Sequence, residues 1–158
     1  MISRLLLVLL TYPLVRSWPG TDQNLVTVSV NESIVFVGID TVISIGVEVK
    51  KGYHVQANKV NDESLIPTTL EVNNVENMNI SKQEFPPGKQ FKLEGAESFL
   101  NVYDEKFLIK LFISPGQEMQ LGKHALDAKL RYQACDSRSC LFPRVIDFSI
   151  PIDVRAMK

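Results

Sequence analysis

The only two cysteines of this 158-residue chain, Cys135 and Cys140, are separated by four residues. They can pair only with each other or with a sulfur atom of a partner. Two neighbouring thiols are the minimum that thiol–disulfide exchange requires, because one thiolate attacks a disulfide and the other resolves the mixed disulfide. Redox exchange is therefore the first hypothesis, beside a purely structural disulfide, which is the ordinary state of cysteine pairs in secreted proteins.

The spacing of the two cysteines indicates a local link at a loop. A bridge that closes a loop of about six residues stabilises a protein by roughly 2 kcal/mol, against about 4.7 kcal/mol for a loop of 100 residues. If the preceding strand stays regular to its end, Cys135 belongs to its polar set of side chains and faces solvent. A bridge that staples the core would instead join the apolar faces of distant strands.

Other chemistries find little support in the sequence. Two sulfur ligands do not complete a tetrahedral zinc site, and His54 and His124 have no motif spacing to the cysteines, so we expect no metal and no other cofactor. The chain has 17 basic and 18 acidic residues without a basic patch, and no nucleic-acid partner is expected. There is also no glycine-flanked nucleophilic serine and no phosphate-binding loop.

The first residues are typical of a secretory signal peptide. Arg4 precedes an apolar run over residues 5–10, and cleavage after Ser17 fits the segment 1–17. The run is too short to span a bilayer, which takes about 20 residues, and nothing later reads as a transmembrane helix. We therefore expect a periplasmic or secreted protein with one domain over residues 18–158. An uncleaved or cytosolic N-terminus is the alternative.

The remaining chain reads as β-structure almost throughout. Apolar residues alternate with polar ones at the period of two that a half-buried strand requires. The four clearest examples are residues 42–50, 107–113, 126–132 and 146–152, and shorter candidates are 25–30, 34–37, 53–57 and 68–72. Many short strands separated by turns predict an all-β protein, an immunoglobulin-like β-sandwich of antiparallel sheets.

Several short motifs resemble a known family. The cysteine segment, which reads YQAC and then CLFP over residues 132–143, resembles the active-site segment of the N-terminal periplasmic domain of the thiol:disulfide interchange protein DsbD. Three upstream motifs occur in the same order as in that domain: Gly52-Tyr53-His54-Val55, Leu65-Ile66-Pro67-Thr68 and Phe85-Pro86-Pro87-Gly88. One proline follows the second cysteine here, where the family commonly has two.

The resemblance implies an immunoglobulin-like sandwich with a redox dithiol. It implies that Cys140 meets the partner and Cys135 resolves, and that thioredoxin-like or membrane-embedded disulfide reductases and oxidised client proteins are the partners. The family's dithiol is lined by the strand that here carries Tyr53, His54 and Gln56. It is covered by a cap loop that corresponds to residues 94–99, which makes Phe99 a candidate lid. Phe142, in the cysteine segment itself, is a further candidate for contact with a partner.

Three classes of function remain open. The first is an exported thiol:disulfide exchange module that relays reducing equivalents through Cys135 and Cys140, a protein-disulfide reductase component. The second is a non-catalytic immunoglobulin-like binding module whose local disulfide is structural. The third is a folding assistant that uses the scaffold for docking alone.

Overall fold

A computed structural model describes residues 24–73 and 75–157, so the expected signal peptide lies outside the described residues. Every regular element in these two ranges is a strand, and within them no helix is long and apolar enough to cross a membrane. The strands are β1 (Val26–Ser29), β2 (Ser33–Phe36), β3 (Thr41–Val49), β4 (His54–Gln56), β5 (Thr69–Val72), β6 (Met78–Glu84), β7 (Lys89–Phe91), β8 (Leu100–Tyr103), β9 (Lys106–Pro115), β10 (Gly122–Tyr132), β11 (Ala134–Cys135) and β12 (Arg144–Arg155).

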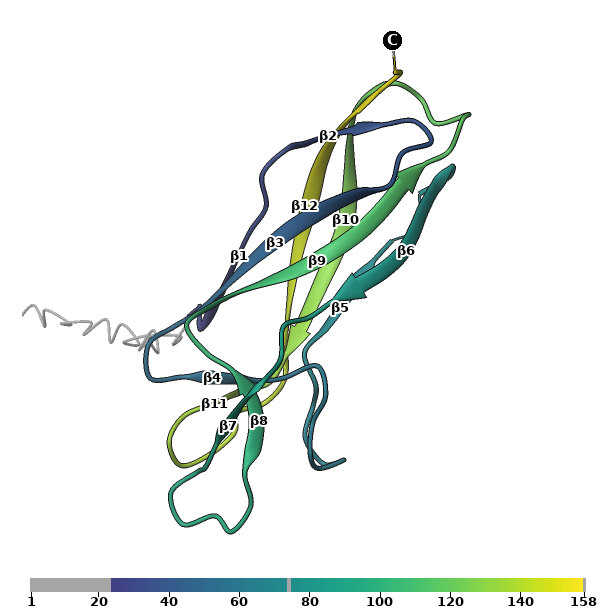
Figure 1. Cartoon of the computed structure of the whole chain (residues 1–158). Helices are drawn as coiled ribbons and strands as arrows, with labels where there is room; N and C mark the ends of the chain where they lie inside the picture. Colours follow the sequence, from purple (N-terminus) through teal and green to yellow (C-terminus); the bar gives the residue numbers. More distant parts are fainter. Residues whose placement is uncertain (1–23, 74, 158) are drawn as a thin grey trace, which may run out of the picture.

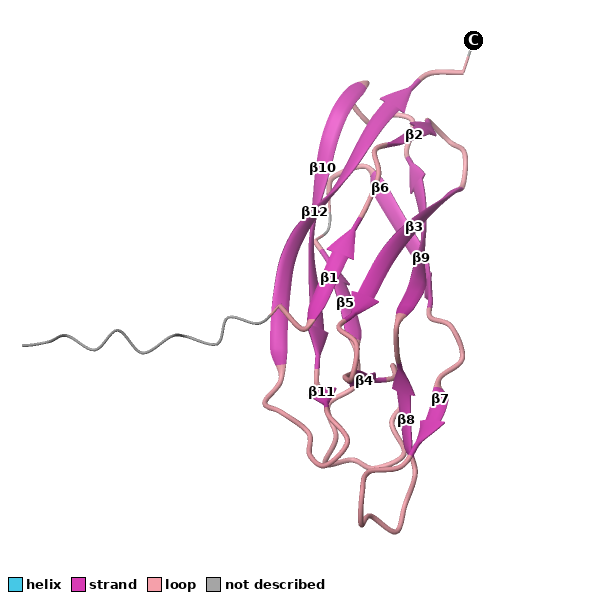
Figure 2. Ribbon diagram, turned by 90° about the vertical axis from the view of Figure 1, so that its left-hand side faces the viewer, coloured by secondary structure: helices cyan, strands magenta, loops and turns pink. Residues whose placement is uncertain are grey.

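Two four-stranded sheets form the sandwich. Sheet A has the strand order β1-β3-β9-β6, and sheet B has the order β2-β12-β10-β5. Neighbouring strands pair antiparallel, except that β2 runs parallel to β12. The two sheets form the long body of the molecule (Figures 1 and 2). The expected all-β, immunoglobulin-like sandwich is thus confirmed, with one parallel pair added to its antiparallel sheets.

The core lies between sheets A and B. In each of the four long segments with clear alternation, buried apolar side chains follow one another at every second position. The largest of the fully buried ones are Ile43, Ile45, Ile109, Leu111, Ile113, Leu126, Leu130, Ile150 and Ile152. Fully burying one such side chain contributes about 1.5–3 kcal/mol, so this alternation supplies most of the free energy that holds the sheets together.

A third, smaller sheet closes one end of the sandwich. Sheet C has the strand order β11-β4-β8-β7, and all of its pairs are antiparallel. Figure 2 shows it below the long strands, with the loops that connect its strands at the tip of the molecule. Strand β12 begins near this end and finishes at the opposite one, close to the C-terminus (Figure 1).

Some strands are absent from the sequence-based expectation. Strand β6 has apolar residues only at Met78 and Ile80, and a β-bulge between Ile80 and Lys82 then shifts its register against β9. Strands β7 and β8 are three and four residues long. A period of two cannot be recognised over so few residues, and a bulge interrupts it.

Candidate functional site

The two cysteines face each other across a tight loop at the end of β11. Cys135 and Cys140 form an antiparallel bridge and are joined by a disulfide. The Leu141 N–H donates to the Ala134 carbonyl at 2.7 Å, and the Asp136 N–H donates to the Ser139 carbonyl at 2.9 Å. The backbone is therefore paired on both sides of the disulfide, which holds the loop as a small hairpin.

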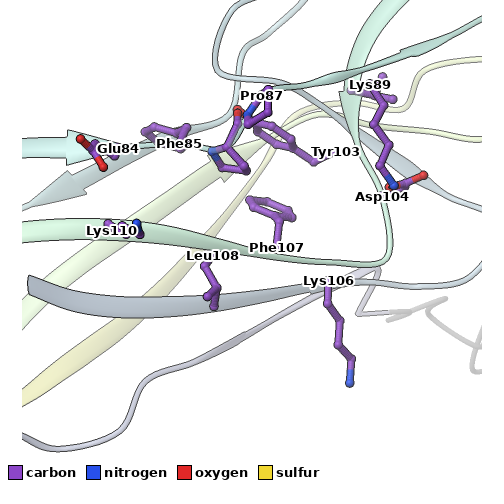
Figure 3. A pocket seen from close by; sticks show the side chains of 12 residues that line it. Glu84, Phe85, Pro87, Lys89, Tyr103, Asp104, Lys106, Phe107, Leu108 and Lys110 are labelled. Atoms are coloured by element: carbon purple, nitrogen blue, oxygen red, sulfur yellow. The ribbon is translucent and has the colours of Figure 1, made fainter.

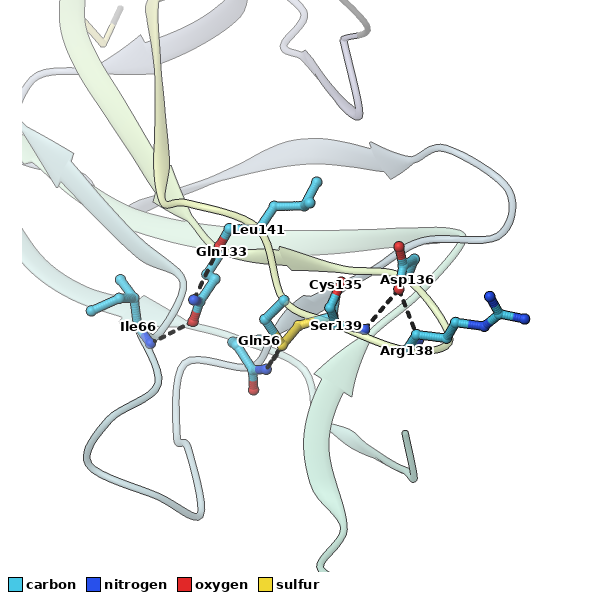
Figure 4. The surroundings of a disulfide bond; sticks show 9 residues. Gln56, Ile66, Gln133, Cys135, Asp136, Arg138, Ser139 and Leu141 are labelled. Atoms are coloured by element: carbon cyan, nitrogen blue, oxygen red, sulfur yellow. Dashed lines mark hydrogen bonds between the residues drawn. A yellow bond between two sulfur atoms is a disulfide. The ribbon is translucent and has the colours of Figure 1, made fainter. Parts of the chain in front are cut away.

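Asp136 shapes the turn between the cysteines. Its Oδ1 atom accepts the N–H groups of Arg138 at 2.7 Å and Ser139 at 2.8 Å (Figure 4). These hydrogen bonds, that from Arg138 first, lower the pKa of Asp136 below its ordinary value. Asp136 is thus a turn-forming residue whose charge is already engaged by the backbone.

Sheet C has two faces with different neighbours. Val55, Ala134 and Tyr103 point to the face that joins the main core. Because side chains alternate along a strand, His54 and Gln56 lie on the other face, and Cys135 is the cross-strand partner of His54. This second face carries the disulfide, and we call it the sulfur face. Its small apolar cluster contains Leu100, Val102 and Cys135, with Leu65, Phe91, Leu93 and Cys140 packed against it.

The prediction that Cys135 faces solvent is wrong. Cys135 is fully buried, with 0% of its surface exposed, whereas Cys140 is partly exposed. The alternation of β10 ends at Tyr132, and Gln133 separates it from β11, so both Ala134 and Cys135 are buried. Strand β11 pairs with β4 in sheet C, and this pairing determines which face of the sheet each of its side chains lies on. The two sulfur atoms are therefore unequal in their access to a partner.

Gln56 contacts the disulfide directly. Its Nε2 atom donates to Cys135 Sγ at 3.2 Å and lies 3.6 Å from Cys140 Sγ (Figure 4). The whole residue is buried, and its Oε1 atom has no hydrogen-bond partner among the described residues. The Thr68 hydroxyl donates to the Gln56 carbonyl at 2.5 Å, and the Gln56 N–H donates to the Gln133 carbonyl at 3.0 Å. The backbone of Gln56 is thus fixed on both sides.

Gln133 connects two of the sequence motifs. Its Oε1 atom accepts the Ile66 N–H at 2.9 Å, and its Nε2 atom donates to the Leu141 carbonyl at 3.1 Å (Figure 4). One side chain therefore ties the LIPT segment to the residue that follows Cys140. The motif glutamine therefore positions the disulfide loop, and neither of these two hydrogen bonds is to a sulfur atom.

The other residues expected on the GYH strand divide between the two faces. Tyr53 packs against the main core. The His54 ring stacks on Phe91 with 3.8 Å between ring centroids, and its Nδ1 atom is buried without a hydrogen-bond partner in the described part of the chain. Gly52 adopts a φ of 87° in the turn that the Tyr53 N–H closes on Lys50, a conformation that favours glycine. Phe91 was not expected here, because the short strand β7 gave no recognisable pattern.

The loop between β7 and β8 packs beside the disulfide loop. The Glu94 N–H donates to the Ser137 carbonyl at 2.8 Å, and the Glu94 carboxylate pairs with Arg138 Nε at 3.2 Å. Phe99, the candidate lid, is 52% exposed, and Lys92 Nζ lies 5.5 Å from the centre of its ring. Phe142 is 91% exposed and follows Cys140 by two residues. The roles of Phe99 and Phe142 remain predictions.

The FPPG motif, residues 85–88, lies against sheet C on the face that joins the main core. The Tyr103 hydroxyl group donates to Asn58 Oδ1 and lies 3.1 Å from the Pro86 carbonyl. A Cβ atom on Gly88 would lie 2.1 Å from Asn101 Oδ1, so a side chain here would displace the Asn101 amide from its hydrogen bond to the Lys59 carbonyl. Figure 3 shows a surface hollow in which Phe85, Tyr103 and Phe107 lie close together. No cysteine lines that hollow, although Val102 of the sulfur-face cluster is among its lining residues.

The protein is thus an immunoglobulin-like sandwich with a disulfide on the sulfur face of a small end sheet, and these two features define its class. The family model for the N-terminal domain of the thiol:disulfide interchange protein DsbD matches residues 23–150. The chain belongs to this family, and the resemblance seen in its motifs is confirmed. It has no significant match among curated proteins.

Two solved structures illustrate the similarity in fold. The N-terminal domain of DsbD from Neisseria meningitidis, in the reduced form, has a TM-score of 0.47 and 14% identity, covering 74% of this chain and 82% of that one. The N-terminal periplasmic domain of ScsB from Proteus mirabilis has a TM-score of 0.52 and 15% identity. That match covers 81% of this chain and 45% of the other, so this chain spans less than half of the ScsB domain's length.

Proposed function

We propose that this chain is an exported thiol:disulfide exchange module that passes reducing equivalents through Cys135 and Cys140 to oxidised periplasmic partners. The asymmetry of the disulfide is the observation that supports this function best. Cys135 is fully buried and Cys140 is partly exposed, so a partner meets one sulfur atom first. Membership in the DsbD N-terminal family supports the same chemistry.

Electrons enter when a reductase attacks the disulfide. A thiolate of a thioredoxin-like or membrane-embedded reductase attacks Cys140 Sγ, forms a mixed disulfide and releases Cys135 as a thiolate. The second thiol of the reductase then attacks the reductase sulfur atom in the mixed disulfide and releases Cys140. The reductase dithiol has been oxidised to a disulfide, and this chain has gained two electrons and, after protonation, two thiols.

Electrons leave by the reverse sequence on another protein. The Cys140 thiolate attacks the disulfide of an oxidised client, and one client cysteine leaves as a thiolate. Cys135 then attacks Cys140 Sγ, which restores the intramolecular disulfide and frees the second client thiol. The client is reduced and this chain is oxidised. Phe142 is largely exposed and Phe99 is about half exposed. We assign these two aromatic side chains to contact with the partner.

Trapping of the mixed disulfide tests the assigned roles. Reduced Cys135→Ser is expected to accumulate a disulfide-linked complex with an oxidised thioredoxin-like protein, because the resolving thiol is missing. The matched variant Cys140→Ser is expected to give none, since its remaining thiol is buried. Electrophoresis without reductant measures both. Complex formation by Cys140→Ser alone would reverse the roles, and complex formation by neither would count against exchange.

A structural disulfide in a binding module is the second candidate, and the complete burial of Cys135 favours it. The reduction potential separates the two functions. A structural disulfide is expected below about −300 mV, and an exchanging one at a less negative value. Equilibration with glutathione or dithiothreitol buffers, followed by alkylation and mass measurement, gives this value.

Export is a separate part of the proposal. Residues 1–17 are proposed as the signal peptide, and the mature protein is then expected to begin at Trp18. N-terminal sequencing of the protein recovered from the periplasm tests this expectation. A protein that keeps its first residues and stays in the cytoplasm would contradict it.

A further inference from the structure

Opening the disulfide by attack at Cys140 places an electron pair on Cys135 Sγ. This sulfur atom is 0% exposed and packs in a cluster with Leu100 and Val102. Water cannot solvate a thiolate there, and apolar surroundings disfavour the charged form of a thiol. Efficient exchange through this sulfur atom therefore needs a hydrogen-bond donor from the protein itself.

The charged groups of the disulfide loop do not supply this donor. The Asp136 carboxylate is engaged by two backbone N–H groups, and Arg138 Nε pairs with Glu94. Figure 4 shows the Arg138 guanidinium group extended away from the sulfur atoms. His54, on the sulfur face, stacks on Phe91, and its buried Nδ1 atom has no hydrogen-bond partner among the described residues.

Gln56 meets the requirement. Its Nε2 atom lies 3.2 Å from Cys135 Sγ, closer than the 3.6 Å to Cys140 Sγ. We propose that Gln56 is a catalytic residue of the exchange reaction, because its Nε2–H group donates to the thiolate that Cys135 becomes when the disulfide opens. This inference rests on the proposed function. The amide takes no proton and no electron; the pair from the broken S–S bond stays on Cys135 Sγ, and the partner thiolate forms the new bond to Cys140 Sγ.

The donor is held in place before the reaction. The Gln56 carbonyl accepts the Thr68 hydroxyl, and the Gln56 N–H is bonded to Gln133. Strand β4 lies between β11 and β8 in sheet C, so its backbone is paired on both sides. A donor that needs no rearrangement when charge develops stabilises that charge most effectively.

Substitution of Gln56 tests this role with dithiothreitol as the reductant, so that no protein partner is involved. Gln56→Met keeps a side chain of similar length without N–H groups, and we expect the disulfide to be reduced about tenfold more slowly, the difference between a hydrogen bond to a charged and to a neutral acceptor. Gln56→Glu places a carboxylate against the developing thiolate and is expected to be slower still.

Tyr103→Phe is the control. It removes a hydrogen bond on the core face of the same small sheet and leaves Gln56 and its backbone partners untouched. It is expected to lower the melting temperature while the reduction rate stays at the wild-type value. The proposal is overturned if Gln56→Met or Gln56→Glu is reduced as fast as the wild type, or if Tyr103→Phe slows reduction equally. Failure of the trapping experiment alone would contradict the proposed function and leave these rates unaffected.

Discussion

The main core and the sulfur face differ in how their side chains are satisfied. The core between sheets A and B consists of apolar side chains that alternate along long strands and are almost completely buried. The sulfur face has a small apolar cluster, a disulfide, and two buried polar atoms without partners in the described residues, His54 Nδ1 and Gln56 Oε1. Such atoms are rare in folded proteins. The comparison indicates that the sandwich provides stability, whereas sheet C carries the polar groups to which we assign the proposed exchange.

The largest effect is expected in the main core. Ile45 is fully buried in β3, and Ile45→Ala should lower the free energy of unfolding by about 4 kcal/mol because it leaves a cavity. The rate of disulfide reduction under folding conditions should not change. Urea titration and thiol alkylation measure the two quantities. A changed reduction rate would show that the two regions are coupled.

Loss of the disulfide should have a smaller effect. The double variant Cys135→Ala/Cys140→Ala should lower the free energy of unfolding by roughly 2 kcal/mol, since the bridge closes a short loop. The protein is expected to remain folded, because the sandwich core does not depend on the bridge. Urea titration against the oxidised wild type, with the reduced wild type as control, measures the loss. Unfolding on reduction would contradict the division between the two regions.

A substitution on the core side of sheet C separates its two faces. Tyr103→Phe removes the hydroxyl group that donates to Asn58 Oδ1, at a cost of about 1 kcal/mol. Because Tyr103 belongs to the main core cluster, the reduction rate should remain that of the wild type. Parallel thermal melts and dithiothreitol kinetics test this. Slower reduction would mean that the two faces of one sheet are not independent.

The smallest effect concerns pH. Hydrogen bonds from Arg138 and Ser139 lower the pKa of Asp136 below 3.8, so its contribution to stability is present above 3.8 and is lost as the pH falls through the lower, folded-state value. Asp136→Asn should remove this part of the acid dependence. Unfolding titrations of both proteins over a pH series that spans 3.8 give the comparison. Identical acid profiles would contradict the assigned role of Asp136.

The long strands were predictable, and the sulfur face was predictable only in part. Ile43, Ile45 and Val47 repeat the alternation long enough to define β3, and the same holds for β9, β10 and β12. The predicted alternation of buried and exposed side chains breaks at Gln133, because the chain passes there from sheet B to sheet C. A change of sheet leaves no mark in the hydrophobic pattern.

The contact between Gln56 and Cys135 joins residues 79 positions apart. The GYH motif placed Gln56 near the dithiol through the family resemblance, but no local pattern reveals which way its amide points. That orientation follows from the pairing of β4 with β11, a long-range feature. The ion pair of Glu94 with Arg138 and the stacking of Phe91 on His54 were missed for a similar reason, since the partners lie in other loops and strands.

Strand β12 runs away from sheet C and ends at the far end of the molecule (Figure 1). Its twelve residues extend over roughly 35 Å, at about 3.3 Å a residue. An affinity tag, a surface linker or an electrode attachment placed after Arg155 would therefore leave Cys140 directed towards solution. Immobilised protein of this kind could be titrated electrochemically without obstruction of the thiols by the support.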